Sequence, residues 1–175
     1  MTPRCTHIPT GLPAKRAPAA AAAVPVLRTD RLRLRAAPPA WNALLVPDIA
    51  GHLGGPHSDE DARSSFCVCV ARRALHGHGL RAVDHGDTGA TTGFVEVGLE
   101  RGDADPEPDW MFRPAPRRQG SANEAARAAH DRAFGEGGLK TLVSYVHTDN
   151  SASAALAQRP GTRPLTFTHH REALQ

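Results

Sequence analysis

The sequence predicts a single α+β domain, and three residue patterns lead to that prediction. Leucines alternate with arginines within residues 27–35, which is typical of a strand with one buried face. Two runs, at residues 80–84 and 92–99, flank a Gly-Asp-Thr-Gly turn and predict a hairpin. Alanines recur at helical spacing over residues 122–134. With a length of 175 residues, these patterns indicate one layered domain.

The N-terminal segment differs in composition from the rest of the chain. Its first 25 residues contain five prolines around a run of alanines and offer little to bury. We therefore expect a disordered leader over residues 1–25 and the domain over residues 26–175. The alternating segment at residues 27–35 would be the first strand of that domain.

Two helices are expected between the first strand and the hairpin. Pro38 and Pro39 begin a short helix that stops near Pro47. Ser58 and Asp61 have the spacing of a helix N-cap, so a longer helix should run from about residue 59 to residue 75. The glycines that follow end it.

The second half of the chain alternates strands and helices. Residues 107–113 form a candidate strand, which Pro106 and Pro108 weaken because proline donates no ladder hydrogen bond. The elements expected after the helix over residues 122–134 are a buried strand at 141–147, a short helix at 152–159 and a last strand at 165–169.

The segment before the alanine-rich helix has features of a phosphate-binding loop. Residues 117–122 read RRQGSA, a turn with small residues at a helix start. Such a turn lets main-chain N–H groups approach an anion, and the positive end of the helix dipole favours negative charge there. Ser121 and Glu124 have capping-box spacing, which predicts a helix that begins close to Ser121.

This loop resembles the acetyl-coenzyme A pyrophosphate loop of the GNAT N-acetyltransferases, which has Gln or Arg, two residues, Gly, any residue, then Gly or Ala. Residues 27–35 (LRTDRLRLR) resemble the first strand of the Rim-type branch, which includes the acetyltransferases of ribosomal-protein N-termini. Residues 110–114 (WMFRP) and 150–153 (NSAS) resemble the strand before the loop and the start of the next helix. The ordered matches span roughly residues 26–161.

The resemblance implies a mixed, mostly antiparallel central sheet with helices on both faces, and acetyl-coenzyme A as co-substrate. The pyrophosphate would contact main-chain N–H groups of residues 118–122, with help from the Arg117 and Arg118 side chains. The pantetheine would pair with the backbone of the preceding strand, which would also donate to the oxyanion. The cofactor-binding residues implied are Trp110, Met111, Phe112, Arg117, Arg118, Gln119, Gly120, Ser121, Ala122, Asn150 and Ser153.

The implied reaction is direct attack of an amine on the acetyl thioester. A base helps because an amine is mostly protonated at neutral pH. Glu107 falls on the Glu that opens the family's E-x-G-Y/W-W strand and is our candidate, with Glu96 and Asp109 as alternatives. Ser153, with Tyr145 behind it, would donate to the leaving thiolate. Asn150 would hold a cofactor or strand amide, or act as an ordinary helix cap.

The chain also departs from the family pattern. The Trp and first Gly of the family's phosphate loop are Arg117 and Arg118 here, and Pro160 and Thr162 interrupt the E-K-L-G-F segment. An alternative hypothesis is therefore a decayed relative that keeps the fold, and with it cofactor or partner binding, but catalyses little. Amine turnover separates the two hypotheses.

Composition limits the partners that we expect. The net charge of +3 is modest and its basic residues are interspersed with acidic ones, which argues against nucleic acid. The three cysteines and ten histidines lack zinc-ligand spacing, so we expect no metal. No run is long and apolar enough for a membrane span. We expect a reduced, cytoplasmic protein with an amine substrate, the amine being a small molecule or a protein N-terminus, and we leave a homodimer open.

Overall fold

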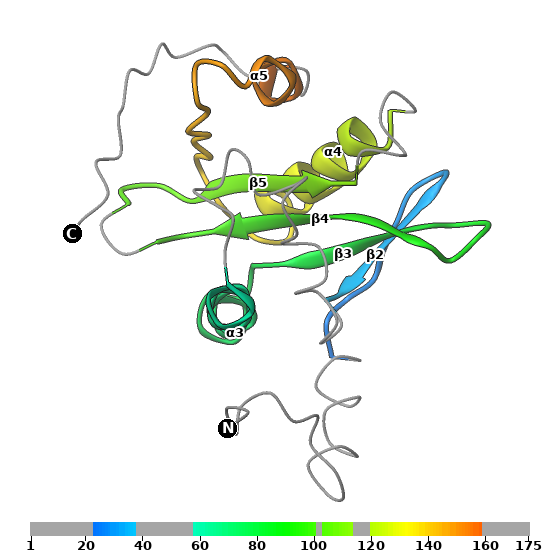
Figure 1. The fold of residues 1–175 in the computed structure, drawn as a ribbon, viewed down its shortest axis with the longest axis horizontal. Helices are drawn as coiled ribbons and strands as arrows, with labels where there is room; N and C mark the ends of the chain where they lie inside the picture. The colour runs from blue at the N-terminus through cyan, green and yellow to red at the C-terminus, as the bar shows by residue number, and fades with distance from the viewer. Residues whose placement is uncertain (1–22, 38–57, 101–102, 114–119, 159–175) are drawn as a thin grey trace, which may run out of the picture.

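The computed structural model describes residues 23–37, 58–100, 103–113 and 120–158, and its five strands form one sheet in sequence order with antiparallel pairings throughout (Figure 1). The strands are β1 Leu27–Arg28, β2 Leu32–Ala36, β3 Arg81–His85, β4 Thr91–Gly98 and β5 Glu107–Phe112. The helices are α3 Asp59–His76, α4 Ser121–Phe134 and α5 Ser151–Gln158. The α+β fold is the predicted one.

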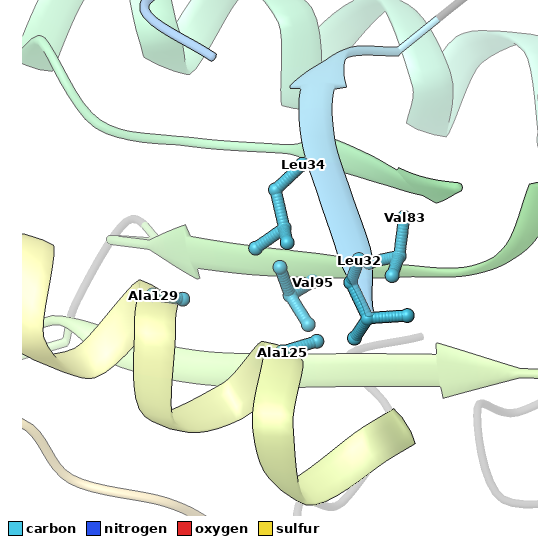
Figure 2. Close-up of a cluster of buried hydrophobic side chains, with 6 residues drawn as sticks. All are labelled: Leu32, Leu34, Val83, Val95, Ala125 and Ala129. Carbon is cyan, nitrogen blue, oxygen red and sulfur yellow. The ribbon is translucent and has the colours of Figure 1, made fainter. Parts of the chain in front are cut away.

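One face of the sheet packs against α4. Figure 2 shows side chains from β2, β3 and β4 that point toward the alanine face of this helix. The fully buried members Leu34, Val83 and Val95 lie opposite Ala125 and Ala129. Because alanine is small, the helix axis can approach the sheet closely, and the larger strand side chains fill the space between the two layers.

The other face packs against α3. Successive strand residues point to opposite faces, so Phe94 lies on the side away from Val95. Phe94 is 1% exposed and joins Ala82 from β3 and Cys69 from α3 in a second cluster. Met111 of β5 packs against this cluster. Side chains of β4 and β5 that follow the Phe94 and Met111 alternation therefore face α3.

The first predicted strand is a hairpin and not one continuous strand. Leu27 pairs with Leu34 and Arg28 with Arg33, so the chain reverses at Thr29. The Thr29 hydroxyl accepts from the Leu32 N–H at 3.0 Å, and the Thr29 N–H donates to the Leu32 carbonyl, also at 3.0 Å. This threonine turn explains why alternation persists in the sequence while the backbone folds back.

The predicted long helix and hairpin are confirmed. The Ser58 hydroxyl accepts from the Asp61 N–H at 3.1 Å, and α3 ends at Gly77, whose φ of 75° suits glycine. β3 and β4 pair across the expected turn. Gly93 of β4 permits a close approach, because a Cβ there would collide with the Met111 carbonyl and the Phe112 ring.

The buried strand expected at residues 141–147 is not formed, and the segment runs beside β5 without entering the sheet. The Val143 N–H donates to the Pro106 carbonyl at 3.0 Å, and the Tyr145 N–H donates to a carboxylate oxygen of Glu107 at 2.8 Å. Pro106 and Pro108 supply no N–H groups in return, so a regular ladder cannot build up. Tyr145 is 44% exposed.

Several expectations lie outside the described residues. These are most of the leader, the short helix after Pro38, the last strand at 165–169 and the interrupted segment around Pro160. Pro25, which we assigned to the leader, accepts a hydrogen bond from Arg81 through its carbonyl. In the part of the chain that the structure describes, no helix is long and apolar enough to cross a membrane.

Candidate active site

The start of α4 presents main-chain donors at one end of the sheet. Gly120 is its N-cap, with a φ of 80° that a residue bearing a Cβ rarely adopts. Helix α4 begins at Ser121, as predicted. However, among the described residues no side chain caps this helix start, so the capping box expected from Ser121 and Glu124 is not formed. Its first-turn N–H groups are suited to an anionic ligand.

Glu124 turns away from the helix start because the first hairpin binds it. Its carboxylate accepts from the Thr29 hydroxyl at 2.5 Å and from the Arg31 N–H at 3.0 Å, and the Arg31 guanidinium lies 2.6 Å away. Burial alone would raise the pKa of Glu124, but the hydrogen bonds from Thr29 and Arg31 outweigh it and hold this pKa below its usual value. The first turn of α4 is thereby tethered to the β1–β2 turn.

The same tether brings the Arg31 guanidinium close to position 120. A Cβ built on Gly120 would lie 3.2 Å from the outer guanidinium nitrogen of Arg31. The cation therefore borders the helix start, where it would add positive potential for a phosphate. The residues present at this end fit the pyrophosphate of acetyl-coenzyme A.

The outer edge of β5 offers a second set of main-chain groups. The Arg113 N–H donates to Thr92 of β4 at 3.0 Å, and the Pro106 carbonyl accepts from outside the sheet. Peptide groups alternate along an antiparallel strand, so those of Trp110 and Phe112 face outward while those of Met111 face β4. Two of the three residues expected to meet the pantetheine thus present their main chain to the edge.

Helix α5 lies beside this edge (Figure 1). The Trp110 indole N–H donates to the Ser153 hydroxyl oxygen at 3.1 Å, which leaves the serine hydrogen available for donation. Asn150 caps α5, because its side-chain oxygen accepts from the Ser153 N–H at 3.1 Å. Of the two roles considered for Asn150, the structure contains the helix cap.

The three candidate bases share the sheet face that packs against α3. Asp109 pairs with Glu96 across the β4–β5 ladder, and Glu107 lies two residues along β5. Glu96 is 4% exposed and lies 3.3 Å from the Arg72 guanidinium. Glu107 accepts from the Tyr145 N–H and holds the segment beside β5. Two of these carboxylates therefore already have structural partners.

Asp109 differs from the other two. Within the described residues, no hydrogen bond or ion pair engages its carboxylate. Burial, followed by repulsion from Glu107, Glu96 and Glu100, raises the pKa of Asp109 to about 8. A carboxyl group with such a pKa is a suitable proton acceptor near neutral or mildly alkaline pH. The signal in the sequence was the departure itself, since Asp109 stands where the E-x-G-Y/W-W motif has Gly.

Cys69 of α3 contacts this carboxylate cluster. Burial and the neighbouring Glu96 raise the pKa of the Cys69 thiol well above its ordinary value, which makes it a poor nucleophile. In the described residues, no three His, Cys, Asp or Glu side chains are placed to hold a metal ion. Arg117, Arg118 and Gln119 lie outside the described residues, whereas Ala122 lies in the first turn of α4.

Comparison with known proteins assigns the fold and its cofactor. Residues 31–163 match the model of the acetyltransferase (GNAT) domain family. An acetyltransferase from Agrobacterium tumefaciens is 35% identical, with a TM-score of 0.73 over 79% of this chain and 83% of that one. A protein described as a GNAT-family acetyltransferase from Bordetella pertussis is 25% identical, with a TM-score of 0.72 over 84% and 93%. Comparison with curated proteins gives no match.

A solved RimL acetyltransferase of ribosomal protein L7/L12, in complex with coenzyme A, shares the fold at 19% identity, with a TM-score of 0.66 over 78% of this chain and 82% of that one. The chain belongs to the GNAT acetyltransferase family. It is an acetyl-coenzyme A-dependent N-acetyltransferase, whose fold is also that of the Rim-type enzymes.

Proposed function

We propose that this enzyme transfers the acetyl group of acetyl-coenzyme A to a primary amine by direct attack, with Asp109 as the general base. The observation that supports the proposal is the position of this unpaired carboxyl on β5, between Glu96 and Glu107, which both have partners, and burial there raises its pKa. A small molecule and a protein N-terminus both meet the requirement for an amine.

The first task is to hold the co-substrate. The first-turn N–H groups of α4, bordered by Gly120 and Arg31, would bind the pyrophosphate. The outward main chains of Trp110 and Phe112 would bind the pantetheine. When bound, acetyl-coenzyme A supplies an acetyl group activated as a thioester.

The second task is to remove a proton from the ammonium form of the substrate. Above a pH of about 8 the Asp109 carboxyl is ionised and can accept that proton directly or through a water. Glu96, Glu107 and Glu100 surround Asp109 with negative charge, which favours approach of a cationic amine. Glu107, the base expected from the sequence, accepts from the Tyr145 N–H and is the alternative base.

The third task is to donate a proton to the leaving thiolate. Ser153 remains the candidate, because the indole of Trp110 orients its hydroxyl oxygen and leaves its hydrogen unused. Tyr145, which is half-exposed and whose N–H is fixed by Glu107, is the alternative donor.

The cofactor site is tested by calorimetry with coenzyme A on the parent and on Gly120→Asp. The substitution adds a carboxylate and a Cβ beside Arg31, so affinity should fall by about tenfold or more. Gly89→Asp is a matched control, because Gly89 has a similar φ of 68° in the β3–β4 turn and a Cβ there meets nothing. Equal affinity in the parent and Gly120→Asp would refute the site.

The chemistry is tested by coenzyme A release against a panel of amines. Release that depends on an amine, with a rate that rises as pH passes about 8, supports Asp109 as the base. If coenzyme A binds tightly but no amine in the panel is acetylated, the proposed reaction is wrong for these amines. The alternative hypothesis, a family member that binds the cofactor but catalyses little, then describes the protein better.

A further inference from the structure

A cationic cavity lies at the end of the sheet opposite to the start of α4. It has a volume of about 190 Å³ and is bounded by the end of α3, the beginning of β3, the end of β4 and the last turns of α4. Helix α4 starts after the C-terminal end of β5, and its last turns border the cavity. The helix start and the cavity are therefore separated by the length of α4. Three guanidinium groups line the cavity, from Arg73, Arg81 and Arg132.

Arg81 is the most buried of the three, at 5% exposed. It alternates with Val83 along β3 and therefore faces α4. One of its terminal nitrogens donates to the Pro25 carbonyl. Among the residues described, no carboxylate lies within ion-pair distance of Arg81. A buried cation that lacks an anionic partner is costly.

Arg73 and Arg132 extend the cation cluster. Arg73 donates to the carbonyls of Gly79 and Leu80, and its buried Nε has no hydrogen-bond partner. In the described part of the chain it has no carboxylate within ion-pair distance either. Arg132 pairs with Glu136, which lies in the turn that follows α4.

The carboxylates of the cavity do not neutralise it. Glu96 also lines the cavity, but it pairs with Arg72 on α3, and Glu136 pairs with Arg132. Arg73 and Arg81 therefore remain without an anionic partner among the described residues. Burial, followed by repulsion from Arg73 and Arg132, lowers the pKa of Arg81 to about 10, so it still carries its charge at neutral pH.

We propose that this cavity binds the oxyanion of a phosphate or carboxylate group, held by Arg81, Arg73 and Arg132. The orphaned Nε of Arg73 and the buried guanidinium of Arg81 would gain the charge-assisted hydrogen bonds that they lack. The volume is below that of pockets that enclose a drug-sized molecule, which matches one anionic group and not a whole nucleotide. The site lies at the end of α4 opposite to the proposed pyrophosphate site.

The test is calorimetric titration of inorganic phosphate into the full chain saturated with coenzyme A, against chloride at equal ionic strength. We expect binding to the parent and a loss of affinity of about tenfold or more in Arg81→Met, the scale of one charge-assisted hydrogen bond. Arg132→Gln, at a less buried position, should weaken binding in the same direction. Arg127→Met on the exposed side of α4 should bind like the parent.

A second arm uses phosphate with Gly120→Asp and no coenzyme A, so the result does not depend on the cofactor proposal. Binding should persist there and disappear in Gly120→Asp combined with Arg81→Met. Phosphoserine and acetate, titrated in the same way, distinguish a phosphate from a carboxylate source. If phosphate fails to bind the coenzyme A-saturated parent, or binds Arg81→Met as tightly as the parent, the proposal is wrong.

Discussion

At the scale of single residues, Asp109 lowers the stability of the fold and at the same time has the properties of a general base. It introduces a carboxyl group between Glu96 and Glu107, on the side of the sheet that packs against α3. Of the three carboxylates on this face, Glu96 pairs with Arg72 and Glu107 accepts from the Tyr145 N–H, which leaves Asp109 in an unfavourable environment. That unfavourable environment gives Asp109 the proton affinity that a base requires.

We predict that Asp109→Asn lowers turnover by about a hundredfold or more yet raises stability. The pKa of Asp109 is higher in the folded protein than in the unfolded one, so the folded state retains a proton that the unfolded state loses. The free energy of unfolding of the parent should therefore fall as pH rises from about 4 to about 8. The variant should lack this slope, as measured by urea unfolding at several pH values.

Glu107→Gln is the matched control for that experiment. It keeps Asp109 and an acceptor for the Tyr145 N–H, so the acidic limb of the pH–rate profile should remain. If Glu107→Gln removes this limb while Asp109→Asn retains it, Glu107 is the base, as the sequence motif suggests.

The two described cysteines should differ in reactivity. Cys67 is exposed on α3, whereas Cys69 is buried against Glu96 and its thiol has a raised pKa. We predict that iodoacetamide labels Cys67 in the native protein and reaches Cys69 only after unfolding. Peptide mass spectrometry after timed labelling distinguishes them. Native labelling of Cys69 at the rate of Cys67 would contradict the packing of α3.

At the scale of secondary-structure elements, the tether between the first hairpin and α4 positions the helix start at which we propose that coenzyme A binds. Glu124 replaces a local helix cap with contacts to Thr29 and Arg31, so the helix start stays open and yet is fixed in position. Because the pKa of Glu124 is lowered in the folded protein, Glu124 contributes fully to stability at pH values above its pKa in the unfolded chain. That contribution is lost as pH falls through the lower folded value.

We predict that Glu124→Gln weakens coenzyme A binding by about tenfold, since the amide cannot pair with Arg31. Glu136→Gln in the turn after α4 is the control, because its partner Arg132 lies at the end of α4 away from the helix start, and it should bind coenzyme A like the parent. A double-mutant cycle of Thr29→Val and Glu124→Gln should give a coupling in coenzyme A affinity. Additive losses would mean that the two residues do not act as one tether.

The sequence predicts individual helices and hairpins well. It predicts poorly where a contact with a distant residue replaces the expected local one. Helix α3, the β3–β4 hairpin and α4 follow from caps, turns and periodicity that lie within each segment. Glu124 has the spacing of a capping box, but a threonine 95 positions away binds it instead. Residues 141–147 have the composition of a strand, but the prolines at the adjoining edge prevent a ladder.

In the candidate site too, features set by neighbouring residues were predicted, and those set by contacts between distant residues were not. The candidate phosphate loop could be picked out because its glycine and the start of the helix are neighbours in the chain. The choice among Glu96, Glu107 and Asp109 required their partners, Arg72 and Tyr145, which lie far away in the sequence. No residue pattern could supply that information.

At the scale of the whole molecule, ligand binding should stabilise the fold. Coenzyme A at about 100 times its dissociation constant should raise the free energy of unfolding by about 2.7 kcal/mol, provided that the unfolded chain does not bind it. Urea unfolding with and without coenzyme A measures this. Gly120→Asp at the same concentration should gain much less, and an equal gain would place the binding elsewhere in the domain.

The hydrogen bond from Arg31 to Glu124 spans 93 residues of chain. Closing a loop of that length costs conformational entropy before any contact rewards it, and contacts between distant residues slow folding. On the ribosome, residues 27–36 are synthesised long before the start of α4, so the proposed pyrophosphate site cannot form until both segments have emerged. In refolding, recovery of coenzyme A binding should therefore follow formation of the α3 helix and the β3–β4 pair.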